Sequence, residues 1–377
     1  MFIYIFISLI LTGLAIINPK SRMIKKIIYL LLGIFLCTSY FNGSDWRTYE
    51  LMYKLANLED IKTFYAEKGF YLYMCIFKIL GFNFFEFFIV TKFIIYCIFY
   101  KILIKSSNFY LVLNIFYYQM GLSLFIDCPL RNLIAVGLVL LGIEQWNKRK
   151  KIKFFLYIVL AVFFHNSALF FLIIPLIYKI GKLSNIAVIM VILVSYIFLI
   201  NQDILIKILK YLPLFQDRLF HYIDSKYSEA RLFSLGSLEK IGIIISIIYY
   251  KNKYKKNLNI ISLIIFYFLL NRITITFSIL GRMAIYLQIF YIIGIGLVIQ
   301  KLRRNLKIII ILVIGLYCNI NIYRITQNTY KYIPYTSYLA YVGKEKPSYE
   351  YRSKYNYIEY IKRNGVDEFI KNYIYNN

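Results

Sequence analysis

Residues 109–126 read FYLVLNIFYYQMGLSLFI, a run of 18 residues without a charged side chain. Such a run is long enough for a transmembrane helix, because a helix rises about 1.5 Å per residue and the hydrocarbon core is about 30 Å thick. Apolar runs recur along the 377-residue chain, which is 60% hydrophobic and 19% aromatic. A soluble domain could not bury so much apolar surface. The sequence therefore predicts an integral membrane protein.

The apolar runs predict an all-α fold, a polytopic transmembrane helical bundle with about 10–12 membrane segments, some of them short or re-entrant. Residues 1–322 form the membrane domain, with extracytoplasmic loops at about 42–66 and 201–239, and residues 323–377 form an extracytoplasmic, tyrosine-rich tail. Glu67–Leu80 is expected to be a short interfacial helix. The segments expected to span or enter the membrane are Phe2–Ile17, Ile27–Phe41, Phe84–Ile104, Phe109–Ile126, Leu133–Trp146, Phe154–Tyr178, Ile186–Ile200, Ile241–Tyr250, Leu258–Leu270, Met283–Gln300 and Ile308–Asn321.

The charge is strongly basic, with 45 Lys and Arg against 18 Asp and Glu. Clusters that begin at Lys20, Lys148, Lys251 and Lys301 lie between apolar runs, which indicates topology signals and no nucleic-acid partner. These clusters should face the cytoplasm, which places both large loops and the tail outside. Five scattered cysteines support neither a disulfide framework nor a zinc site.

Phe154–Tyr178 has basic residues at both ends, so the positive-inside rule places both ends on the same side. We expect a broken or re-entrant pair of helices with His165 at the turn, and one long tilted helix is the alternative. Irregular backbone at membrane depth is tolerated only where protein buries it or where it lines a wet cavity. His165 is therefore a candidate general base, because imidazole titrates near neutral pH, although a structural hydrogen bonder is the competing interpretation.

Arg131 and Arg282 each lie near the start of an apolar run. A cation there faces the unfavourable end of the helix dipole, so something anionic should offset it. Arginine binds phosphate groups bidentately, which suits a membrane-embedded diphosphate. The alternative for Arg131 is a snorkelling side chain or one paired with Asp127.

Acidic residues in the outer loops are the other candidates. Asp45 lies in the stretch Asn42–Tyr49, and Glu67 begins the stretch Glu67–Phe70. The long loop at 201–239 carries Arg218 and His221, and it either covers an active site or merely connects two helices.

Short motifs recur in a recognisable order along the chain: Gly43–Asp45 with Tyr49 and Tyr53, Glu67–Phe70, Leu130–Asn132 with Ala135, Phe164–Leu169, Gly281–Arg282 with Tyr286, and Tyr332–Tyr335. In this order they resemble the EpsG family of membrane proteins, which is similar in role to Wzy-type polymerases of O-antigen, capsule or exopolysaccharide repeat units. Two positions depart from the family pattern, because the family usually has Arg-Gln at Arg131–Asn132 and Glu-Pro-Gly at Glu67–Gly69.

The resemblance implies a glycosyltransferase in the bacterial cytoplasmic membrane, with its active site facing outward. Its substrates would be oligosaccharides linked to undecaprenyl diphosphate within the membrane lipid, and a chain-length regulator and a flippase would be its partners. No cofactor or metal is expected, because no DxD-type motif occurs in the outer loops. The expected catalytic residues are His165, Asp45 and Glu67, and the expected substrate-binding residues are Arg131, Arg282, Tyr49, Tyr286, Arg218 and His221.

Two other classes of protein share some of these features. A membrane O-acyltransferase that modifies surface glycans would also use a histidine at membrane depth, reached from the cytoplasm. A flippase for lipid-linked oligosaccharides would need cationic residues, but it predicts repeated halves that the sequence lacks.

Overall fold

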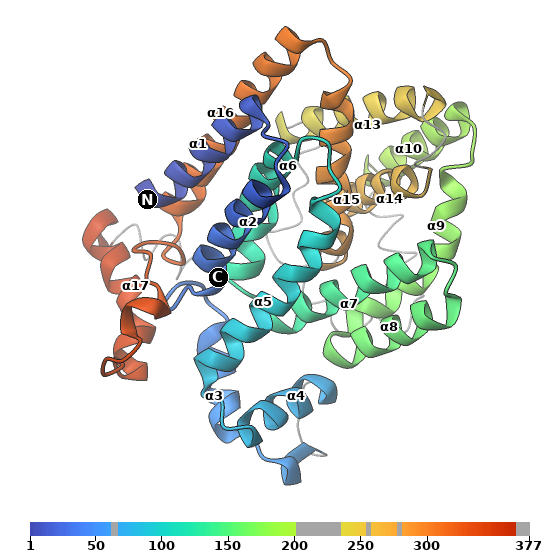
Figure 1. Ribbon diagram of the computed structural model, residues 1–377. Helices are drawn as coiled ribbons and strands as arrows, with labels where there is room; N and C mark the ends of the chain where they lie inside the picture. Colours follow the sequence, from blue (N-terminus) through green and yellow to red (C-terminus); the bar gives the residue numbers. More distant parts are fainter. Residues whose placement is uncertain (62–66, 201–234, 254–257, 277–280, 367–377) are drawn as a thin grey trace. The chain divides into compact units, whose positions relative to one another are not determined.

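The computed structural model describes residues 1–61, 67–200, 235–253, 258–276 and 281–366 (Figure 1). Within these ranges the chain is helical, and its β-structure is one isolated bridge between Ser39 and Ser337. The predicted all-α fold is confirmed. The described chain divides into two compact units, residues 1–138, 163–166 and 303–377 in the first and residues 139–162 and 167–302 in the second.

The first unit contains the N-terminal helices and the C-terminal ones. Its α6 continues without a break into the π-helix η2, and the first part of α7 also belongs to it. The elements are α1 (Phe2–Ile17), α2 (Arg22–Cys37), α3 (Trp46–Leu55), η1 (Leu58–Ile61), α4 (Lys68–Ile79), α5 (Phe84–Leu103), α6 (Phe109–Phe116), η2 (Tyr117–Ile126), α7 (Leu130–Asn147), α16 (Arg304–Asn328), η8 (Tyr338–Tyr341) and α17 (Tyr349–Asn364).

The second unit contains the remainder of α7 and the helices that follow it. Helix α13 begins at Leu235, so the loop expected over residues 201–239 ends earlier than its predicted boundary. The elements are α8 (Lys151–Phe164), η3 (Asn166–Ile173), α9 (Ile174–Ile180), α10 (Asn185–Ile200), α13 (Leu235–Lys253), α14 (Leu258–Thr276) and α15 (Gly281–Gln300).

Membrane-spanning capacity differs among these helices. Of the described residues, three stretches are long and apolar enough to cross a bilayer: Phe109–Ile126, Gly281–Gln300 and Arg304–Asn328. Helices α4 and α5 count as a fourth if they form one span, although they meet at an angle of 119°. The expected 10–12 segments therefore include helices that are too short to span alone, among them Phe2–Ile17 and Asn166–Ile180.

Helix boundaries follow local capping. Helix α2 begins five residues before its predicted start because Ser21 caps it, with its hydroxyl accepting from the Ile24 amide at 3.4 Å. Helix α5 begins after Asn83, which forms a capping box with Glu86. The turn before α5 contains Gly81, whose φ of +85° suits glycine.

Polar contacts within an apolar core join α1 to α6 in the first unit. Asn108 donates to the Ala15 carbonyl at 2.9 Å, and Asn114 donates to the Thr12 hydroxyl at 3.0 Å. Helix α16 lies beside α1 (Figure 1), where a Cβ added at Gly315 would come within 2.6 Å of the Thr12 Oγ1 atom. These helices are therefore closely packed.

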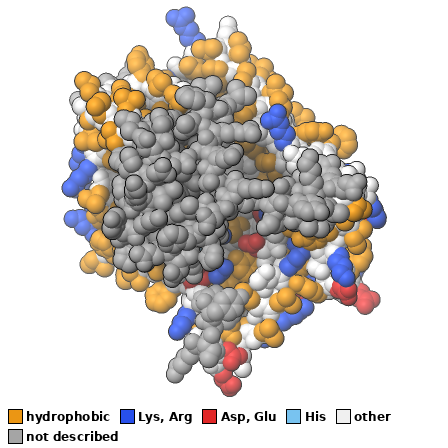
Figure 2. Space-filling view, turned by 180° about the vertical axis from the view of Figure 1, so that it is seen from behind, with side chains coloured by type: hydrophobic (Ala, Val, Ile, Leu, Met, Phe, Trp, Pro, Cys, Tyr) orange, Lys and Arg blue, Asp and Glu red, His pale blue; other side chains and the backbone are white. Residues whose placement is uncertain are grey.

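Apolar side chains also cover much of the surface. Where side chains are coloured in Figure 2, hydrophobic ones are widespread, with Lys and Arg side chains scattered among them. On α16, Val313 is 60% exposed and Leu316 is 63% exposed. Such faces are costly in water and suit contact with lipid, as expected for a multi-pass membrane protein.

Candidate functional site

The loop before α3 has a backbone that only glycine fits at one position. Gly43 has a φ of +87°, and its amide donates to the Lys331 carbonyl at 2.7 Å. A Cβ at this position would lie 2.3 Å from the Ile126 carbonyl oxygen, at the end of η2. The Gly43-Ser44-Asp45 motif therefore lies directly against the connection between η2 and α7.

Asp127 fixes this loop from the other side. Its carboxylate accepts from the Ser44 amide at 2.8 Å and the Ser44 hydroxyl at 2.7 Å, and Lys331 donates to it at 2.7 Å. Asp127 thus joins the loop to the segment after α16. Its pairing with Lys331 also corrects one alternative from the sequence, in which Asp127 was to pair with Arg131.

The segment after α16 provides a second set of contacts to the loop. The Asn42 amide group donates to the carbonyls of Tyr332 and Pro334 at 3.0 and 2.9 Å, and its oxygen accepts from the Thr336 amide at 2.9 Å. The Tyr332–Tyr335 stretch, far from the loop in sequence, therefore forms part of the loop's support.

Arg131 lies in the first turn of α7, after Cys128, which has a positive φ of 47°, and Pro129. Its Nη1 atom donates to Glu67 Oε2 at 2.6 Å, and the side chains are 32% and 14% exposed. The Nε atom of Arg131 is buried without a hydrogen-bond partner among the described residues. Glu67 therefore supplies the anionic partner that the start of α7 requires, and the guanidinium retains an unused donor.

Tyr49 completes this cluster from α3. Its hydroxyl lies within hydrogen-bonding reach of Arg131, and its side chain is only 4% exposed. Burial raises the pKa of Tyr49 to about 12, the charge of Asp45 adds to the effect, and Arg131 opposes it. Tyr49 therefore stays a neutral hydroxyl at physiological pH.

Asp45 is partly buried, and one of its carboxylate oxygens accepts from the Ser44 hydroxyl at 3.1 Å. Two carboxylates, one phenol and one guanidinium are thus gathered in the first unit, and we call Asp45, Tyr49, Glu67 and Arg131 the arginine cluster. Of the described residues, no three His, Cys, Asp or Glu side chains form a group suited to a metal ion.

The expected break beside His165 is present, and the choice between a re-entrant pair and one long tilted segment stays a prediction. Helix α8 ends at Phe164, and the 3₁₀-helix η3 begins at Asn166. A Cβ added at Gly69 would lie 2.7 Å from the Phe163 carbonyl oxygen, so the start of α4 packs on the backbone just before the break. His165 is partly buried, and its role as a base and the re-entrant path of this segment stay predictions.

The remaining expected site residues lie elsewhere. In the second unit, Arg282 is exposed in the first turn of α15, while Tyr286 is fully buried and shares a 2.9 Å hydrogen bond with Ser167. The expected convergence of Arg282 with Arg131 stays a prediction. Arg218 and His221 lie outside the described residues.

Sequence analysis missed several buried charged residues. Lys92 is fully buried in α5 and donates to Ser39 at 3.0 Å, and Glu50 forms a buried ion pair with Arg352. A lysine within an apolar run was a visible signal for Lys92. Glu50 and Arg352 gave no such signal, because 302 residues separate them and both lie in polar stretches.

The fold and the arginine cluster define a helical, multi-pass membrane protein in which a loop held by its C-terminal segment lies near a partly buried arginine. The family model described as "EpsG family" matches residues 22–337, so the chain belongs to the EpsG family, which is associated with exopolysaccharide biosynthesis. No curated protein and no solved structure matches the chain.

Proposed function

We propose that the protein is a Wzy-like glycosyltransferase that polymerises oligosaccharide repeat units carried on undecaprenyl diphosphate. The product would be an exopolysaccharide, a capsule or O-antigen. The enzyme would act in the bacterial cytoplasmic membrane with its site facing outward. A flippase would supply the substrate, and a chain-length regulator would act on the product.

The observation that supports this most is the arginine cluster. Arg131 is partly buried, is oriented by Glu67 through one Nη atom, and keeps a buried Nε donor without a partner among the described residues. A diphosphate needs several N–H donors in a site with little water, and a guanidinium fork supplies them. We assign Arg131 to the diphosphate and expect Arg282 to assist it.

In the proposed reaction a hydroxyl of the acceptor sugar attacks the anomeric carbon of the donor chain. The new glycosidic bond forms as the bond between that carbon and the diphosphate oxygen breaks, and the lipid diphosphate leaves with the bonding electrons. The hydroxyl proton passes to a base, for which His165 and Asp45 are the candidates. Arg131 stabilises the charge on the leaving group, and Tyr49 provides a neutral hydroxyl beside it.

The structure suggests a different role for Glu67 from the catalytic one expected. Its carboxylate already accepts a hydrogen bond from Arg131 at 2.6 Å, so this oxygen is committed to the guanidinium. We propose that Glu67 holds the Arg131 guanidinium in one orientation while its other nitrogens bind the diphosphate.

Glycan analysis of a strain that lacks the gene tests the function as a whole. We expect single repeat units to remain on the lipid carrier where the parent strain makes long polymer, and the gene supplied in trans should restore the polymer. Polymer of normal length in the deletion strain would contradict the proposal. Full-length polymer that lacks only an acyl substituent would instead indicate an acyltransferase.

A further inference from the structure

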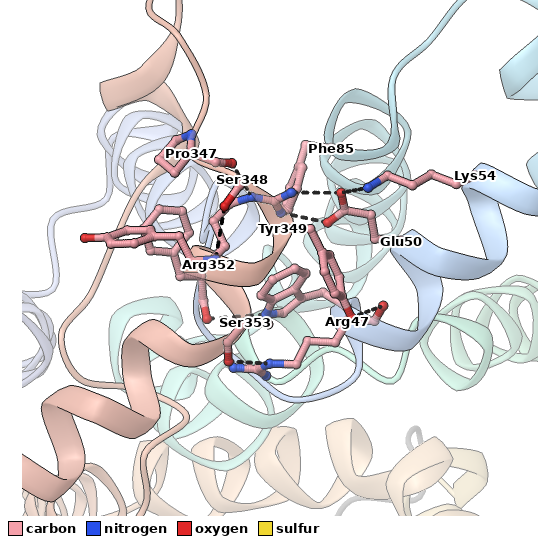
Figure 3. A network of polar contacts seen from close by, with 12 residues as sticks. Arg47, Glu50, Lys54, Phe85, Pro347, Ser348, Tyr349, Arg352 and Ser353 are labelled. Atoms are coloured by element: carbon pink, nitrogen blue, oxygen red, sulfur yellow. Dashed lines mark hydrogen bonds and ion pairs between the residues drawn. The ribbon is translucent and has the colours of Figure 1, made fainter.

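Helix α17 lies beyond residues 22–337, which the family model matches, yet a buried ion pair attaches it to α3 (Figure 3). Arg352 donates from Nη1 to Glu50 Oε2 at 2.7 Å and from Nη2 to Glu50 Oε1 at 2.8 Å. The two side chains are only 6% and 5% exposed. Lys54 lies 3.0 Å from the same carboxylate.

Aromatic rings surround the Arg352 guanidinium. Its Nε atom donates to the Pro347 carbonyl at 3.0 Å, so its remaining donor group is also engaged. Loss of Glu50 would leave the buried Arg352 charge unpaired, and loss of Arg352 would leave the buried Glu50 carboxylate with Lys54 as its remaining cation, so both changes are unfavourable. The rings that lie within 6 Å of the guanidinium carbon belong to Tyr40, Trp46, Phe85 and Tyr349.

Arg47 connects α17 to the Gly43-Ser44-Asp45 loop. Its Nε atom donates to the Ser353 carbonyl at 3.1 Å, and its Nη1 atom donates to the Gly43 carbonyl at 2.7 Å. Figure 3 shows the two arginines reaching in opposite directions, with Arg352 of α17 donating to Glu50 of α3 and Arg47 of α3 donating to Ser353 of α17. One side chain thus joins α17 to the residue two positions before Asp45.

A second connection runs through the segment after α16. Asn356 of α17 is fully buried and donates to the Tyr330 carbonyl at 3.1 Å. The next residue is Lys331, which donates to Asp127, and Asp127 accepts from Ser44. Helix α17 therefore supports the loop from two directions.

We infer that α17 is a positioning element, which holds the Gly43-Ser44-Asp45 loop in its working geometry through Arg352 and Arg47. Its effect on turnover rests on the proposed function, whereas its effect on the loop does not. Neither arginine is assigned contact with substrate. Loss of α17 docking should move the loop, with Asp45, away from Arg131 while α7 and Arg131 stay in place.

The test measures the loop without any enzymatic assay. A Ser44→Cys variant in a Cys97→Ser background is purified in detergent, and its rate of reaction with a charged maleimide is compared with and without Arg352→Met. Cys97 is replaced because it is the exposed one among the five cysteines. Lys354→Met is the matched control, because Lys354 is 63% exposed on the same helix and forms its ion pair with the exposed Glu350 of that helix.

We expect Arg352→Met and Glu50→Gln each to raise the labelling rate at least about tenfold, and Lys354→Met to leave it unchanged. The double variant Glu50→Leu/Arg352→Met should label more slowly than either single variant, because it leaves no unpaired buried charge of the pair. Equal labelling of Arg352→Met and the Ser44→Cys parent would overturn the inference. A double variant that labels as fast as the single variants would show that the faster labelling comes from general unfolding. That result would also overturn the inference.

Turnover is then measured on the full chain with its native Ser44. Arg352→Met should lower kcat for repeat-unit joining more than about tenfold and change KM for the donor little, because Arg131 keeps its place. Arg352→Lys should recover part of kcat. If the unaltered protein joins no repeat units, the proposed function fails while the labelling result still decides the role of α17.

Discussion

Arg131 Nη1 and Glu67 Oε2 are 2.6 Å apart, although 64 residues separate them in sequence. The contact joins the first turn of α7 to the residue that precedes α4. Because Glu67 uses one nitrogen of the guanidinium, it orients the others without occupying them. The contact is the basis for the proposal that Glu67 orients Arg131, which in turn is proposed to bind the diphosphate.

Replacing the Glu67 carboxylate by an amide tests the proposed orienting role. Glu67→Gln keeps the shape of the side chain but removes the charge, so we expect a loss of about 10- to 100-fold in kcat/KM, with most of it in KM for the lipid-linked donor. Glu59→Gln is the control, because Glu59 is exposed in η1, eight positions before Glu67 in the sequence. A donor KM that stays unchanged in Glu67→Gln would contradict an orienting role.

Two glycines with nearly equal backbone angles form a matched pair for stability. Gly43 and Gly81 have φ values of +87° and +85°, but only at Gly43 would a Cβ collide with backbone, 2.3 Å from the Ile126 oxygen. Gly81→Ala should therefore destabilise the fold by about 1 kcal/mol from strain alone, and Gly43→Ala by clearly more. Thermal unfolding in detergent measures the loss of stability in both variants. Equal losses would show that the loop can move away from η2 with little loss of free energy.

The choice of base is open to direct comparison. His165→Ala should lower the chemical step by roughly 10²- to 10⁴-fold if the imidazole accepts the hydroxyl proton, and donor binding should change little. Asp45→Asn is the counterpart, since the amide keeps the hydrogen bond with Ser44 but cannot take a proton. Single-turnover kinetics decides between them: retained turnover in His165→Ala together with its loss in Asp45→Asn would assign the base to the carboxylate.

The docking of α17 should depend on pH through Glu50. Burial alone would raise the pKa of Glu50, but the hydrogen bonds and charges of Arg352 and Lys54 lower it below the usual 4.5. A lowered pKa in the folded state gives stability that is present above the unfolded value and is lost as the pH falls through the folded one. Tyr40 lies nearby and stays neutral in this range, because burial raises its pKa to about 12.

Trp46 reports on this docking, because Arg352 lies 5.3 Å from its ring. In a Trp146→Phe background Trp46 is the remaining tryptophan of the chain's two. We expect its fluorescence to stay constant from pH 7 to about pH 5 and to change below about pH 4.5. In Glu50→Gln the change should be absent, and a transition of unaltered size in that variant would assign it to another group.

The sequence predicted the helical class, most helix positions and the break beside His165, because apolar period, charge clusters and helix-breaking residues are local signals. Helix ends were less accurate where a capping residue decided them, as Ser21 does for α2. The pairing of Glu67 with Arg131 could not be derived, since it depends on how α4 packs on the backbone near Phe163. The inferred role of α17 was not predicted, because its polar residues indicated an exposed tail. Only the folded structure shows that Glu50 lies beside Arg352.

The most direct test of the account uses purified protein in liposomes with an undecaprenyl-diphosphate-linked repeat unit, and it compares the unaltered chain with Arg131→Lys. Lysine keeps the positive charge but loses the planar fork that Glu67 orients and the diphosphate is proposed to bind. We expect the unaltered protein to make a ladder of polymer and Arg131→Lys, at equal protein levels, to make about 100-fold less per unit time. A ladder of near-normal rate and length from Arg131→Lys would contradict the central claim that this guanidinium binds the leaving diphosphate.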